Sequence, residues 1–229
     1  MAGSVVNLTV HGIGPADRTL DDGEDGTWVS VARFEQVLDA VAGRRDVRIT
    51  FDDGNASDVD VALPMLLRRG LTAEFFVLAG ELDKPGRLDK DAVRELARAG
   101  MLVGSHGWAH RDWRTLTARQ AAEEFGEARR VLADLTGQQV SRAAIPFGSY
   151  DRQVLRRLRR ADVTRVYTSD GGRAHPSSWL QARTSLRHDL DDEWIRRVLD
   201  GRPPLAVHAR KRLARAVKRS RGRPLGASR

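Results

Sequence analysis

The sequence predicts a parallel α/β fold, because short β-favouring apolar runs alternate with segments of helical period over most of its 229 residues. A second observation is that glycine follows the end of several predicted helices, where it commonly terminates them. The composition, with 41% hydrophobic and 31% charged residues, is that of a water-soluble globular chain long enough for one sizeable domain. The absence of cysteine excludes disulfides and thiolate metal sites.

The first two predicted strands are residues 5–10 and 47–51. Between them, Ser30 is a residue type that caps helices, and apolar residues recur after it at helical spacing. The face of this helix consists of Phe34, Val37, Leu38 and Val41. A second helix is predicted over residues 57–69, where Pro64 predicts a kink or a frayed first turn.

The same alternation continues to residue 199. Further strands are predicted at residues 73–78, 101–105, 140–145, 164–168 and 182–186. Further helices are predicted at residues 90–99, 117–135, 151–160 and 191–199. Seven strands with intervening helices favour a closed or partly open barrel with one β/α unit fewer than eight. An open, doubly wound sheet is the alternative, since periodicity does not separate the two.

The net charge of +8 belongs to the C-terminal segment. Residues 209–229 contain nine Lys or Arg and no acid, which leaves 30 basic against 31 acidic residues elsewhere. We therefore predict a barrel domain at 1–201 and a flexible basic tail at 202–229, with a short helix at 210–219. An appended tail argues against nucleic acid as a partner. It is either a solvated segment or an attachment to an anionic membrane surface.

The N-terminal segment lacks the basic and apolar regions of a secretory signal, and no apolar run approaches the length that spans a bilayer. These features predict cytoplasmic residence, with the tail allowing a peripheral position at the membrane surface.

Polar residues follow four of the predicted strands. His11 follows the first strand, Asp52 and Asp53 the second, His106 the fourth, and residues 146–148 the fifth. Loops after parallel strands converge at one rim of an α/β fold, so these side chains are expected to meet.

Adjacent carboxylates at one rim repel each other unless a cation lies between or beside them. His106 and His110 are four residues apart, and either a helix or a tight loop brings both imidazoles to one side. Two imidazoles and one carboxylate with an open position are typical of a hydrolytic zinc site or a related first-row metal site. One aspartate would bind the metal and the other would stay free as a base. A metal in such a site lowers the pKa of bound water to about 7.

Four segments resemble the polysaccharide deacetylases with a NodB-homology domain, carbohydrate esterase family four. They are Thr-Phe-Asp-Asp-Gly at 50–54, Ala-Glu-Phe-Phe-Val at 73–77, Gly-Ser-His-Gly-Trp-Ala-His at 104–110 and Pro-Phe-Gly-Ser-Tyr-Asp at 146–151. The resemblance covers roughly residues 5–199. It implies a distorted (β/α)7 barrel of the NodB-homology type and one divalent metal ion, commonly zinc, with cobalt or nickel as alternatives.

By the same resemblance, Asp53, His106 and His110 are the metal ligands and Asp52 is the general base. A backbone N–H near Phe147 would stabilise the oxyanion together with the metal.

The chain departs from the family pattern at Ala144, where the family usually has an arginine that orients the base. Arg142 and Arg183 are the two candidate substitutes. Arg142 lies one pleat, roughly 6–7 Å, away on the same strand face, and Arg183 on a later strand is the favoured candidate.

The second departure concerns the general acid, which the family usually carries in a Leu-x-His motif near its C-terminus. His208 is near that place, but no convincing strand precedes it. The segment Leu8-Thr9-Val10-His11 instead resembles the arrangement of a circularly permuted subgroup, which includes deacetylases of biofilm poly-N-acetylglucosamine. His11 is therefore the expected acid.

The leading hypothesis is a metal-dependent hydrolase that removes acetyl groups from N-acetylated amino sugars of a polysaccharide or glycan intermediate. The residues expected to contact this acetylated carbohydrate are Phe147, Tyr150, Trp108 and Arg183. Two alternatives stay open: a non-catalytic carbohydrate-binding module on a decayed deacetylase fold, suggested by Ala144, and a hydrolase of non-sugar amides.

Overall fold

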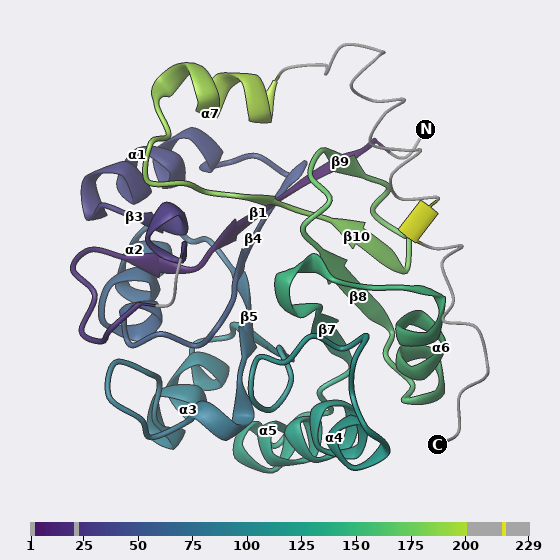
Figure 1. The fold of residues 1–229 in the computed structure, drawn as a ribbon. Helices are drawn as coiled ribbons and strands as arrows, with labels where there is room; N and C mark the ends of the chain where they lie inside the picture. The colour runs from purple at the N-terminus through teal and green to yellow at the C-terminus, as the bar shows by residue number, and fades with distance from the viewer. Residues whose placement is uncertain (1–2, 21–22, 201–216, 219–229) are drawn as a thin grey trace.

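A nine-stranded sheet forms the centre of the molecule (Figure 1). This computed structural model describes residues 3–20, 23–200 and 217–218. The strand order is β10-β8-β7-β6-β5-β4-β1-β11, and β9 pairs with β1 outside this path. Their bounds are β1 Val5–Val10, β4 Val47–Phe51, β5 Ala73–Val77, β6 Leu102–Ser105, β7 Arg142–Ala144, β8 Arg165–Thr168, β9 Arg173–Ala174, β10 Leu180–Ala182 and β11 Thr184–Ser185.

One continuous chain segment nearly closes this sheet into a barrel. The two ends of the strand path, β10 and β11, are separated in sequence only by Arg183. β10 pairs with β8 and β11 pairs with β1, both in parallel. Among the strands that the structure describes, the short β9 alone is antiparallel, to β1. The predicted barrel is therefore confirmed, and the open doubly wound alternative is wrong.

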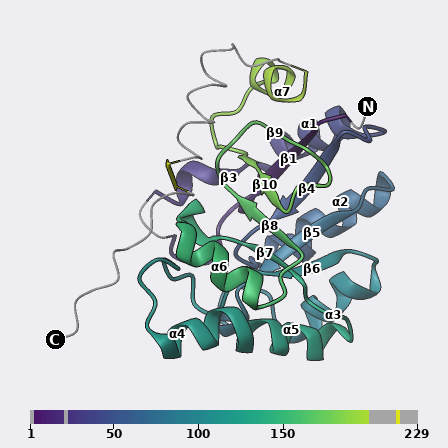
Figure 2. The ribbon, with the colours of Figure 1, turned by 90° about the vertical axis from the view of Figure 1, so that its right-hand side faces the viewer.

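Helices cover the outside of the barrel (Figure 2). Their bounds are α1 Val31–Val41, α2 Leu63–Arg68, α3 Lys90–Arg98, α4 Ala118–Ala122, α5 Ala128–Thr136, α6 Arg152–Arg160 and α7 Asp192–Leu199. The predicted Ser30 cap is confirmed, since its hydroxyl accepts the N–H of Arg33 at 3.2 Å. The predicted α1 face is also buried, because apolar residues at this spacing share one side of the helix.

Apolar side chains between the sheet and the helices form the main core. Phe51 of β4 stacks on Phe75 of β5 with ring centroids 4.4 Å apart, and Phe34 of α1 meets the edge of Phe51. Such aromatic packing holds β4 and β5 in register. The C-terminal ends of these strands are thereby fixed in place.

The structure differs from the sequence prediction in local detail. Residues 117–135 do not form one regular helix, because the π-helical turn η4 (Glu123–Glu127) separates α4 from α5. A second π turn, η2 (Asp58–Ala62), precedes α2 and its Pro64. The two-residue strands β2 (Gly12–Ile13) and β3 (Trp28–Val29) were not predicted, since a pattern of alternation needs a longer run.

Residues 201–216, which follow the predicted domain boundary, lie outside the described residues, so the division into barrel and tail stays a prediction. The predicted helix at 210–219 lies outside the described residues except for 217–218. Among the described parts of the chain, no helix has the length and apolarity needed to cross a bilayer.

Candidate metal centre and active site

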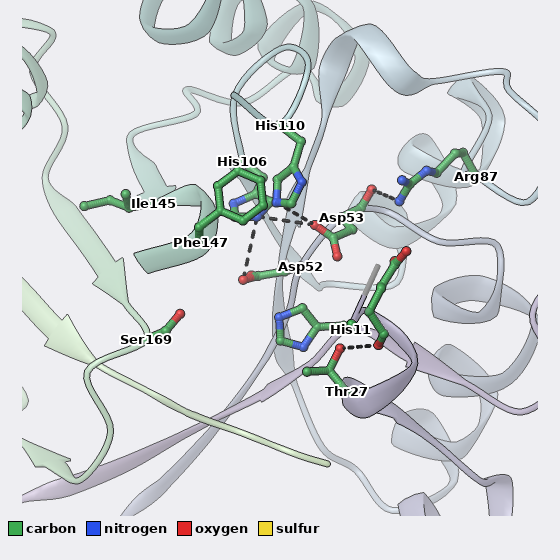
Figure 3. Close-up of a pocket in the computed structure, with 12 residues that line it drawn as sticks. His11, Thr27, Asp52, Asp53, Arg87, His106, His110, Ile145, Phe147 and Ser169 are labelled. Carbon is green, nitrogen blue, oxygen red and sulfur yellow. Dashed lines mark hydrogen bonds and ion pairs between the residues drawn. The ribbon is translucent and has the colours of Figure 1, made fainter. Parts of the chain in front are cut away.

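A pocket opens at the C-terminal ends of the strands (Figure 3). Six residues singled out from the sequence contribute to its walls: His11, Asp52, Asp53, His106, His110 and Phe147. The expectation that the four loops converge at one rim is confirmed.

A tight turn after β4 presents the two carboxylates. Asp53 and Gly54 both have left-handed backbone conformations, with φ of 75° and 64°. Aspartate is among the few residues that tolerate this region. At Gly54 a Cβ would also approach the Val77 side chain to 3.2 Å. Asp52 and Asp53 are consequently both buried, at 2% and 5% exposure.

The two histidines come from the loop after β6 and approach Asp53 with their Nε2 atoms. His106 Nδ1 lies 2.9 Å from the carbonyl oxygen of Ala144 and donates to it, which leaves Nε2 facing Asp53. Its Nε2 lies 3.4 Å from Asp53 Oδ1. His110, with a positive φ of 50°, places its Nε2 3.6 Å from the same oxygen.

This donor set fits a divalent metal ion. One ligand atom from each of Asp53, His106 and His110 lies within 4.8 Å of the others. Ligand atoms about 2.0–2.1 Å from a tetrahedral zinc ion are separated by roughly 3.4 Å, close to the observed spacings. Asp53 Oδ1 is buried and has no hydrogen-bond partner among the described residues. A cation would satisfy that oxygen, so these residues form a possible metal site, although they do not identify the metal.

The two histidines have pKa values shifted in opposite directions. Burial alone would lower the pKa of His106, but the carboxylates of Asp52 and Asp53 raise it above its usual value. For His110, burial and the nearby His106 lower the pKa to about 4. His110 is therefore neutral at pH 7, as a metal ligand must be.

Asp52 is held by Arg183 rather than by a residue of its own strand. The Arg183 guanidinium donates to both carboxylate oxygens, each at 2.6 Å, and is itself 1% exposed. Burial would raise the pKa of Asp52, but the charge of Arg183 and that of His106 outweigh burial, so the pKa lies below its usual range. Such bidentate, charge-assisted pairs fix both position and orientation.

The structure distinguishes the two arginines proposed to compensate for Ala144. Arg142 pairs with Glu74 at 2.7 Å, near the opposite end of the barrel. Arg183 lies over the rings of Phe76 and Tyr167, which form one buried cluster with Ala144. The pairing expected of the family arginine is therefore made from the β10–β11 segment.

His11 reaches the pocket from the N-terminal strand, because β1 lies beside β4 in parallel register. Figure 3 shows its ring beside Asp52. Its Nδ1 is buried and has no hydrogen-bond partner in the described chain. A role as a proton donor stays a prediction.

The predicted carbohydrate-contacting aromatics lie in different environments. Phe147 is 65% exposed, with its ring centroid 4.2 Å from that of His110. Tyr150 is buried and donates its hydroxyl to Asp170 at 2.7 Å. Trp108 is partly buried against the main core. Phe147 thus presents an exposed ring beside His110, and Arg183 contacts Asp52. The contacts of all four residues with a carbohydrate stay predictions.

Sequence reasoning missed the polar residues that support the aspartate turn. Asn55 donates to the carbonyl oxygen of His11 at 2.6 Å and accepts from Arg87 at 3.0 Å, and Arg87 also donates to the Asp53 carbonyl. Asp58 is buried, and burial together with Asp53 and Asp52 raises its pKa well above the usual range. The spacing Asp-Asp-Gly-Asn-x-x-Asp was the available signal, but a turn explains it equally well.

Together, the barrel and its Asp-His-His cluster define an α/β protein with a candidate metal centre at the C-terminal rim. The sequence profile of the family described as "Polysaccharide deacetylase" matches residues 39–166. The chain belongs to this family.

Among curated proteins, the chain is 24% identical over 167 residues to YxkH of Bacillus subtilis, which is named as a polysaccharide deacetylase without an established activity. That match covers 73% of this chain and 60% of YxkH. It is 29% identical over 144 residues to a chitooligosaccharide deacetylase of Rhizobium leguminosarum bv. trifolii, covering 62% of this chain and 63% of that protein. The chain thus spans less than two thirds of each of these relatives.

Among solved structures, the deacetylase PplD of Streptococcus pyogenes, in complex with acetate, superposes with a TM-score of 0.76 at 18% identity. The superposition covers 87% of this chain and all of PplD. IcaB of Ammonifex degensii has a TM-score of 0.67 at 22% identity, covering 83% of this chain and 94% of that one. At these identities the likenesses establish the fold.

Proposed function

We propose that this chain is a metal-dependent deacetylase that hydrolyses the acetamido group of N-acetylated amino sugars in a polysaccharide or glycan intermediate. The observation that carries the proposal is the convergence of Asp53, His106 and His110 within 4.8 Å. The carboxylate of Asp52, held by Arg183, lies beside this cluster.

A divalent metal bound by these three residues, with zinc as the first choice and cobalt or nickel as alternatives, would supply a Lewis acid for the acetyl carbonyl and an activated water. Asp52 is the general base and accepts a proton from the attacking water. Arg183 keeps Asp52 ionised and fixes both of its oxygens. The backbone N–H near Phe147 is the proposed donor to the developing oxyanion.

His11 is the proposed general acid, which delivers a proton to the leaving amine as the carbon–nitrogen bond breaks. Its place in the pocket wall supports this role. The strand that carries it precedes β4 in the sequence and lies beside it, which is the arrangement expected of the circularly permuted poly-N-acetylglucosamine deacetylase-like subgroup. We infer that the chain belongs to that subgroup.

An N-acetylated amino sugar is the favoured substrate because one curated relative is named a chitooligosaccharide deacetylase. The exposed ring of Phe147 beside the pocket supplies an apolar face on which a sugar ring could stack. In the same proposal, residues 1–201 form the catalytic domain, and the basic segment 202–229 attaches it to an anionic membrane surface.

A decayed, non-catalytic carbohydrate-binding module is the competing hypothesis suggested by Ala144. The pairing of Arg183 with Asp52 removes its main support, because the base has an arginine partner from another strand. Hydrolysis of a non-sugar amide by the same residues remains the second alternative. A screen of acetylated glycans against small cyclic amides separates it from the proposed deacetylase.

The test is metal analysis combined with an acetate-release screen on the full chain. We expect about one divalent ion per chain, acetate release from N-acetylated oligosaccharides, and loss of activity on chelation that zinc or cobalt reverses. Small cyclic amides serve as the competing substrate class. Metal-loaded protein that binds glycans but releases no acetate from any of them would contradict the proposal.

A further inference from the structure

The loop that contains His110, residues 107–111, packs around a buried carboxylate that the proposed reaction does not use. Glu124 is 1% exposed and lies in the π-helical turn η4. π turns inside longer helices frequently occur at functional sites, because they displace one side chain from the regular helical position.

Four donors converge on this carboxylate. The backbone N–H groups of Trp108 and Ala109 donate to it at 2.8 and 3.2 Å. The indole of Trp113 donates at 3.2 Å, and the guanidinium of Arg111 lies at 3.3 Å. Glu124 thus contacts the loop backbone, the side chain of Arg111 at the end of the loop, and the side chain of Trp113 just after it.

The carboxylate also occupies the space that a side chain at position 107 would need. Gly107 has a φ of 95°, and a Cβ built there would overlap Glu124 Oε2. On the other side of the loop, the carbonyl oxygens of Gly107 and Trp108 accept the N–H groups of Ala79 and Gly80. The loop backbone is therefore held from both sides, with Glu124 accepting the N–H groups of Trp108 and Ala109.

The two histidines depend on this loop to different extents. His106 lies at the end of β6, and its ring is fixed by the bond to Ala144. Across the described chain, His110 has no equivalent hydrogen bond to a carbonyl group. It also has a positive φ, an unfavourable conformation that persists only where its surroundings enforce it. The position of His110 therefore depends on the loop.

We propose that Glu124 is a positioning residue that holds the 107–111 loop so that His110 meets Asp53 and His106 around one cation. This role rests on the proposed metal site. It predicts that the affinity for the metal, and not only the stability of the fold, depends on the carboxylate of Glu124.

The test uses the full chain, freed of metal and titrated with Co²⁺ while its visible absorption spectrum is recorded. In Glu124→Gln, one carboxylate oxygen is replaced by an NH₂ group, which cannot accept the hydrogen bonds that the loop N–H groups donate to that oxygen. We expect Co²⁺ affinity to fall about 10- to 100-fold, the usual effect of losing a partner that orients a metal ligand. The spectrum should approach that of His110→Ala, and backbone amides 108 and 109 should exchange hydrogen faster.

Glu123→Gln is the matched control. Glu123 is adjacent and also pairs with Arg111, at 2.8 Å, but it accepts no bond from the loop backbone among the described contacts. Its Co²⁺ affinity and spectrum should stay as in the wild type. Glu124→Asp keeps the charge on a shorter side chain and should fall between the two, and it serves as the readout if the glutamine variant does not fold.

Wild-type Co²⁺ affinity and spectrum in both folded Glu124 variants would overturn the positioning role, even if their melting temperatures fell. A wild-type chain that binds no Co²⁺ would instead refute the proposed metal site. The two failures are thus distinguishable before any substrate is tested.

Discussion

Two buried carboxylates face arginines inside the same barrel, one at each end. At the C-terminal rim, Asp52 accepts two bonds from Arg183. Near the N-terminal mouth, Glu74 accepts the Tyr167 hydroxyl at 2.8 Å and pairs with Arg142 at 2.7 Å. Both belong to strands or strand ends of the central sheet, so their difference shows what distinguishes a candidate active site from a structural ion pair.

Hydrogen-bond satisfaction does not separate the two ends. Each leaves one buried carboxylate oxygen without a partner among the described residues, Oδ1 of Asp53 and Oε2 of Glu74. Charge does separate them. Glu74 has an arginine and a neutral phenol as partners, whereas Arg183 faces Asp52 with a second carboxylate, Asp53, directly beside it. The rim therefore holds one carboxylate more than it holds arginines, which favours a cation beside Asp53, and the mouth has no such excess.

Backbone conformation also separates the two ends. Asp53, His110 and Phe147, all in the pocket wall, have positive φ values, although none of them is glycine. Residues held in such conformations occur preferentially at functional sites. At the mouth, Glu74, Arg142 and Tyr167 lie within regular strands. The backbone at the rim thus lowers the stability of the fold relative to that at the mouth, as expected of a site that is shaped for chemistry.

The largest expected effect comes from removing the carboxylate at the rim. Asp52→Asn should reduce kcat by about 10²- to 10⁴-fold, because a general base contributes on that order. Acetate release and metal content are measured together, and metal should remain because Asp53, His106 and His110 are intact. The matched change at the mouth, Glu74→Gln, should leave kcat within about two-fold and lower stability by about 1–3 kcal/mol. Equal losses of activity in both variants would contradict the functional distinction between the ends.

A smaller effect is expected from exchanging the arginines. Arg183→Lys keeps the charge but loses the planar two-point contact with Asp52, so kcat should fall about 10- to 100-fold at unchanged metal content. Arg142→Lys, in contact with Glu74, is the control and should leave kcat unchanged. If only the KM of the Arg183 variant rose, Arg183 would act on the substrate rather than on the base.

The smallest effect concerns stability at high pH and is specific to the mouth. Burial and the neighbouring Glu74 raise the pKa of Tyr167 to about 12. Below pH 10 the phenol is neutral in both the folded and unfolded chain. Above it the unfolded chain loses this proton first, so the stabilisation is lost as the pH rises towards 12. Between these pH values the wild type should lose about 2 kcal/mol more than Tyr167→Phe, measured by urea unfolding at pH 9 and 11.5. Parallel losses in the two proteins would show that Tyr167 titrates normally.

The positions of most strands and helices and the identity of the candidate metal ligands followed from the sequence. Those features are local: strand runs and helix faces repeat at fixed spacing, and the Asp-Asp-Gly and His-x₃-His segments lie directly after strands. Irregular local features were missed. The π turns at 58–62 and 123–127 look like ordinary helix in sequence, because their side chains keep nearly helical spacing.

What the sequence determined by itself was which side chains arrive at the rim, since strand ends and the loops after them are local properties. The tertiary structure decided which of those side chains meet. Closure through the β10–β11 segment brings Arg183 to Asp52, 131 residues away in sequence, and leaves Arg142 to Glu74. The π turn in the 118–136 segment likewise brings Glu124 to the histidine loop. Such pairings depend on how a barrel closes and where a helix bulges, and neither leaves a periodic signal in the chain.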